Sequence, residues 1–156
     1  MGWLLLTSEV DFAFPVLGFT PDKEIWGFPD LNRLTRCGPS TVPQGRQIGM
    51  ELVDAKGRRW IVRAVERVGP AEPFFKNLLN ALLSTPQTRI VQHLDTAEPL
   101  SIAAVQDKAC ASLEAFPEDY ALYEPEDLAA MLAKVRKTRS VKALFELLTP
   151  DTFEAY

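Results

Sequence analysis

The feature that most constrains the fold is a β-hairpin centred on the segment Asp54-Ala55-Lys56-Gly57. Asp at the first position and Gly at the last suit a type I turn followed by a left-handed residue, which closes a three-residue hairpin loop. Pairing Asp54 with Arg58 then places only apolar side chains on one face, namely Met50, Leu52, Trp60 and Val62. A slip of one residue would mix polar and apolar side chains, so the sequence predicts this register over about residues 48–68.

The opposite face of the predicted hairpin is mixed and partly basic. It holds Arg59, Arg63 and Arg67 on the second strand, interleaved with the apolar residues Ile61 and Val65. A basic ribbon of this kind could follow nucleic-acid phosphates or meet an acidic partner, which would make the chain a nucleic-acid-binding or adaptor module. The alternative is a solvated sheet face on which Glu51, from the first strand, compensates the charge of one or two of these arginines. The net charge of −4 favours the alternative and makes nucleic acid an unfavoured partner.

The segments on either side of the hairpin differ in character. Residues 3–6 predict a first strand that could continue to Phe14, and a long Pro/Gly-rich stretch over 15–46 follows. Asp30 in this stretch is a suitable N-cap for one short helical turn. A loop of this length is unusual in a compact domain, so it is either functional or contains short strands that the sequence pattern does not show.

The second half of the chain predicts mostly helix. Apolar spacing indicates a helix over 75–82, and caps or helix-starting residues indicate three more, beginning at Ser101, Pro125 and Ser140. Residues 88–94 alternate as a strand between the first two helices. Strands come mostly first and helices mostly last, which predicts an α+β fold: a small, mainly antiparallel sheet packed against about four helices.

Length and composition indicate one ordinary globular domain spanning residues 1–156. The apolar run near the N-terminus has no preceding basic residue and ends at Ser8-Glu9, so we expect neither a signal peptide nor a membrane partner. Cys37 and Cys110 have no paired spacing, which favours reduced thiols and a cytoplasmic location. The acidity is concentrated in residues 79–156, which hold seven Lys/Arg and twelve Asp/Glu.

The sequence contains no recognisable catalytic, cofactor-binding or metal-binding motif, so we expect no cofactor. The single histidine rules out a multi-His metal site, and no Cys/His spacing matches zinc. An enzyme would have to pair His93 with Cys37, Cys110 or a serine, or use two of the many carboxylates. A histidine on a strand is more often an ordinary sheet residue, so the pattern favours a binding protein over an enzyme.

The segment from Glu114 to Asp127 is the strongest candidate for function. It contains six acidic residues and no Lys or Arg, with three aromatic residues interleaved. Acidic groups speed association with a basic protein, and aromatic anchors slow dissociation. The alternative is a helix–helix connection with its aromatic side chains in the core. The predicted partner-binding residues are Glu114, Glu118, Asp119, Tyr120, Tyr123 and Glu124.

A small, acidic, cysteine-poor α+β chain without motifs resembles the immunity proteins that bacteria make against their own polymorphic toxins. The hairpin sequence Gly49-Met50-Glu51-Leu52-Val53-Asp54 with Gly57-Arg58-Arg59-Trp60 is also similar to bacterial single-domain proteins of unassigned function. The resemblance implies a cytoplasmic protein that binds one toxin domain and blocks its active site or its access to substrate; the acidic segment fits a toxin domain that is basic. It assigns no role to any individual residue.

Overall fold

The structure is a computed structural model that describes residues 4–37, 45, 47–70 and 88–148. Its strands are β1 (Leu5–Leu6), β2 (Val16–Phe19), β3 (Ile25–Phe28), β4 (Arg36–Cys37), β5 (Glu51–Val53), β6 (Arg59–Pro70) and β7 (Thr88–Ala97). Its helices are α1 (Leu31–Leu34), α3 (Ile102–Ala115), α4 (Pro125–Lys137) and α5 (Val141–Leu148), with 3-10 helices η1 (Thr7–Glu9) and η2 (Pro117–Tyr120). The predicted α+β fold is confirmed.

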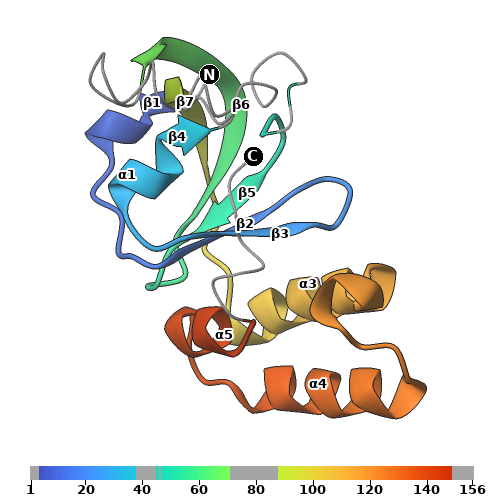
Figure 1. The fold of residues 1–156 in the computed structure, drawn as a ribbon. Helices are drawn as coiled ribbons and strands as arrows, with labels where there is room; N and C mark the ends of the chain where they lie inside the picture. Colours follow the sequence, from blue (N-terminus) through green and yellow to red (C-terminus); the bar gives the residue numbers. More distant parts are fainter. Residues whose placement is uncertain (1–3, 38–44, 46, 71–87, 149–156) are drawn as a thin grey trace.

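The strands of the described residues form one antiparallel sheet. Its order is β1-β7-β6-β5-β2-β3, and β4 pairs with β7 on the same edge as β1. The helices α3, α4 and α5 gather below the β2–β3–β5 end of this sheet, whereas α1 lies at its other side (Figure 1). The helix predicted over 75–82 lies outside the described residues.

The hairpin has the register that the sequence predicts. Leu52 lies opposite Trp60, and the Asp54 amide donates to the Arg58 carbonyl at 3.0 Å. Gly57 has φ +80°, and its amide donates to the Asp54 carbonyl at 2.9 Å, as expected for a left-handed residue that closes the loop. The side chains of its predicted apolar face are all buried.

The prediction for the arginine-bearing face is wrong beyond Arg63. Val62 lies opposite Leu94 and Ala64 lies opposite His93, so Arg63 is the extra residue of a β-bulge. The bulge reverses the alternation of side chains along the rest of β6. Val65 therefore packs against the cluster that contains Trp60, and Arg67 lies opposite Ile90 on that same side. Arg59 and Arg67 consequently do not share a face.

The Pro/Gly-rich stretch does contain short strands. β2 and β3 pair as a hairpin and are buried on both faces, so their sequences show no polar alternation. The first strand is confined to Leu5–Leu6, where η1 replaces the possible extension to Phe14. Asp30 caps α1 as predicted, since its carboxylate accepts from the Arg33 amide at 2.8 Å.

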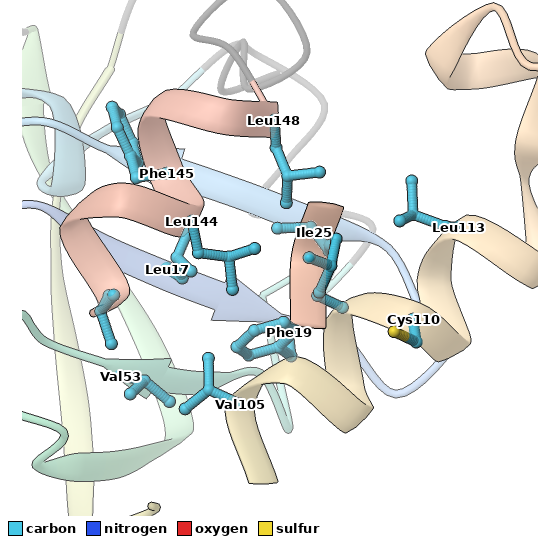
Figure 2. Close-up of a cluster of buried hydrophobic side chains, with 13 residues drawn as sticks. Leu17, Phe19, Ile25, Val53, Val105, Cys110, Leu113, Leu144, Phe145 and Leu148 are labelled. Carbon is cyan, nitrogen blue, oxygen red and sulfur yellow. The ribbon is translucent and has the colours of Figure 1, made fainter. Parts of the chain in front are cut away.

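Two apolar clusters cover the two faces of the β2–β3–β5 end of the sheet. One contains Val16, Trp26, Phe28, Met50 and Trp60. The other joins the sheet to the helices, because side chains of β2 and β3 meet those of α3 and α5 (Figure 2). Gly18 lies between β3 and β5, where an added Cβ would be 2.5 Å from the Met50 sulfur.

The helices begin where the sequence predicts. Ser101 and Ser140 cap α3 and α5 by accepting from the Ala104 and Ala143 amides at 3.2 and 3.0 Å, and Pro125 is the first residue of α4. In Figure 1, α4 lies on the far side of α3 and α5 from the sheet. None of the helices in the described parts of the chain has the length and apolar character needed to cross a membrane.

Candidate functional site

The connection between α3 and α4 is held in a fixed shape by its own backbone. Pro117 begins η2, and Ala121 ends it in a left-handed conformation at φ +56°. The Leu122 amide donates to the Pro117 carbonyl at 2.9 Å, and the Ala121 amide donates to the Glu118 carbonyl at 3.2 Å. We refer to residues 114–127 as the acidic segment. Its turn presents consecutive acidic residues to the outside of the helical layer.

All six carboxylates of the acidic segment are exposed, and none of them makes an ion pair with another described residue. They are Glu114, Glu118, Asp119, Glu124, Glu126 and Asp127. Glu126 and Asp127 lie in the first turn of α4, where the positive end of the helix favours them. The fold therefore uses at most a part of this charge.

The aromatic side chains of the acidic segment have different environments. Tyr123 is 75% exposed. Tyr120 packs against the helical cluster, and its hydroxyl lies 3.3 Å from the Ser112 hydroxyl. Burial raises the pKa of the Tyr120 hydroxyl above its ordinary value of 10.0, against the lowering effect of the Ser112 hydrogen bond. Tyr120 is thus mainly a packing residue, whereas the Tyr123 ring is exposed to solvent.

A shallow pocket of about 380 Å³ lies where η2 meets α4 and α5. Its lining comprises Glu118, Asp119, Tyr120, Ala121, Tyr123, Met131, Leu147 and Leu148. Four of the predicted binding residues therefore line one depression, whereas Glu114 and Glu124 do not. The helical spacing of apolar residues in the sequence predicts Met131 and Leu148 as core residues and leaves Leu147 out. The signal that could have identified Leu147 is its apolar side chain outside the regular stripe of α5.

Two of the three arginines on the second hairpin strand, Arg59 and Arg63, make ion pairs within the fold. Arg59 contacts Glu51 at 2.9 Å and also donates to the Glu98 carbonyl. Arg63 contacts Asp95 at 3.2 Å. The bulge separates Arg67 from both of them. These residues therefore do not form the continuous basic ribbon that nucleic-acid phosphates would require.

His93 lies on the sheet, with its Nε2 atom 3.2 Å from Glu66 Oε2. Cys110 is buried in the helical cluster, where burial raises the pKa of its thiol and so disfavours the nucleophilic thiolate. The charged groups that influence this thiol belong to Arg136, Glu114 and Asp107, not to His93. No group of three or more potential metal-binding side chains occurs within residues 4–37, 45, 47–70 and 88–148.

Comparisons of the chain with known protein families, with curated proteins and with solved structures found no match.

Proposed function

We propose that this chain is a non-enzymatic protein-binding module that recognises a basic partner through the acidic segment. The observation that carries the proposal is a cluster of exposed carboxylates without ion-pair partners among the described residues, beside the exposed Tyr123. Several acidic residues elsewhere in the described part of the chain are paired: Glu51 contacts Arg59 and Lys108, and Asp107 contacts Arg136. Unpaired charge beside an exposed aromatic side chain is typical of a surface that associates rapidly and binds through an anchor.

The more specific form of this proposal comes from the resemblance to immunity proteins. In that form, the partner is a basic toxin domain, and binding of the acidic segment blocks its active site or its access to substrate. A toxin that acts on nucleic acid needs a basic surface to hold phosphates, and an acidic protein surface can compete for it. A protein partner identified as such a toxin would support this form, and a partner of another kind would restrict the proposal to protein binding.

The test compares two triple charge reversals in a chain whose partner has been captured from the source cell and identified. The site variant carries Glu118→Lys, Asp119→Lys and Glu124→Lys. The matched control carries Asp11→Lys, Glu66→Lys and Glu98→Lys, which change the net charge equally at exposed positions elsewhere. Association is measured by stopped flow at several salt concentrations, and stability is measured by thermal unfolding.

We expect the site variant to associate at least about tenfold more slowly at low salt, with a difference that shrinks as salt screens the charges. Its stability should change little, because the three carboxylates are exposed and unpaired among the described residues. The control should associate at nearly the unmodified rate. Equal association rates for both variants would show that only net charge matters, and a destabilised site variant with unchanged binding would remove the acidic segment from the interface.

A further inference from the structure

The pocket beside the acidic segment is lined by partly buried apolar side chains, which we call its floor, and by exposed carboxylates, which we call its rim. Met131 from α4 and Leu147 from α5 contribute apolar surface, and both side chains are only partly buried. Glu118 and Asp119 contribute carboxylates to the lining, and Tyr123 contributes an aromatic ring. This volume, about 380 Å³, is near the lower end of the roughly 300–1,000 Å³ found for ligand pockets. It suits one side chain better than a large ligand.

We infer that this pocket receives an apolar side chain of a partner segment in which Lys or Arg flanks that side chain on both sides. The inference rests on the proposed function and names the chemistry of its contact. An apolar side chain would displace water from Met131 and Leu147, which gives the anchoring contribution of a hot spot. The flanking cations would meet Glu118 and Asp119, and the Tyr123 ring offers one of them a cation–π contact.

Charge complementarity disfavours other occupants of the same pocket. A bare cation would meet carboxylates at the rim but would lose its hydration over an apolar floor. An acidic or neutral apolar segment would fill the floor and leave the rim carboxylates repelled or poorly hydrated. A segment that carries both an apolar side chain and flanking cations complements the apolar floor and the carboxylates of the rim at once.

The experiment uses three capped tripeptide amides as probes: Arg-Leu-Arg, Arg-Ser-Arg and Gln-Leu-Gln. Their binding to the full chain is followed by NMR of methyl-labelled methionines. Met131 reports on the pocket, and Met50 is an internal control because it is fully buried in the other apolar cluster. Backbone amide shifts over residues 114–127 report separately on contacts with the acidic segment.

We expect Arg-Leu-Arg to shift the Met131 methyl saturably without moving Met50. Arg-Ser-Arg should bind at least about tenfold more weakly at Met131, because it lacks the apolar anchor. Gln-Leu-Gln should be weakened similarly, because it lacks the cations. In the Leu147→Lys variant, the advantage of Arg-Leu-Arg over Arg-Ser-Arg should disappear, since the added ammonium group replaces apolar surface.

Equal binding of Arg-Leu-Arg and Arg-Ser-Arg, with amide shifts but no Met131 shift, would overturn the pocket inference and leave the acidic segment as a charge-based surface. Absence of any shift with all three peptides would also overturn the pocket inference. The proposed function is decided separately by the charge reversals with the captured partner. The two failures are therefore distinguishable.

Discussion

Replacing Asp54 by Asn tests how the central hairpin is fixed to the rest of the sheet. The Asp54 side chain is fully buried. Its Oδ1 accepts from the Lys56 and Arg58 amides, both at 3.0 Å. Its Oδ2 accepts from the Ala13 amide at 3.2 Å and from Nη2 of the Arg58 guanidinium at 2.7 Å. One carboxylate thus joins the turn to the segment that precedes β2.

The expected loss follows from the geometry at Oδ2. An Asn side chain that keeps its oxygen at the Oδ1 position places its NH₂ group against the Ala13 amide and the Arg58 guanidinium, which are both donors. Hydrogen bonds to charged groups contribute about 1.5–3 kcal/mol each, and breaking one side of a buried charge pair costs about 3–5 kcal/mol. The Arg58 side chain is 41% exposed, so water recovers part of its solvation. We therefore expect a loss of about 2–4 kcal/mol in the free energy of unfolding.

Urea unfolding followed by tryptophan fluorescence measures this loss. Trp60 is a local reporter, because its ring lies edge-on to Phe12, 4.8 Å between centroids, in the segment that Asp54 holds. The midpoint should fall while the m-value stays unchanged. The matched control is Asp95→Asn, which removes the exposed ion pair with Arg63 and should cost at most about 1 kcal/mol. Equal losses for the two variants would refute the argument that the buried carboxylate fixes the hairpin.

Two further predictions concern the core and the acidic segment. Gly18→Ala should lower the free energy of unfolding by about 1–3 kcal/mol, because the added Cβ meets the Met50 sulfur, and Met50→Val in the same chain should recover part of the loss in urea unfolding. In a Tyr123→Phe, Tyr156→Phe chain, phenolate absorbance should give Tyr120 a pKa above 10.0, since burial disfavours the charged form. Because the pKa of Tyr120 is higher in the folded than in the unfolded chain, the contribution of its neutral hydroxyl to the free energy of unfolding is present below pH 10 and is lost as the pH rises further. A pKa at the ordinary value would contradict the burial of Tyr120.

The parts of the fold that the sequence predicts are those with local causes. The Asp54–Gly57 turn sets its own register, and Ser101, Pro125 and Ser140 start their helices through contacts within one turn. The bulge at Arg63 has no such local cause, because it depends on pairing with β7, about thirty positions along the chain. The sequence also does not predict β2 and β3, because burial on both faces removes the alternation of polar and apolar residues that identifies a strand.

The candidate site likewise has one part that the sequence predicts and one part that it does not. Pro117 and Pro125 lie within the acidic segment, just after the end of α3 and at the start of α4, so the position of most of its carboxylates between or at the ends of two helices follows from the sequence. The pocket does not follow from the sequence, because its lining combines Leu147 of α5 with Met131 of α4, and local sequence patterns do not show which helices pack together.

The difference between buried carboxylates that the fold engages and exposed carboxylates without ion pairs bears on function. The carboxylate of Asp54 is buried and fully engaged by the fold, whereas those of Glu118 and Asp119 make no ion pair with described residues. A charge change at Asp54 should therefore alter stability first, and one at Glu118 or Asp119 should alter binding while the fold remains intact.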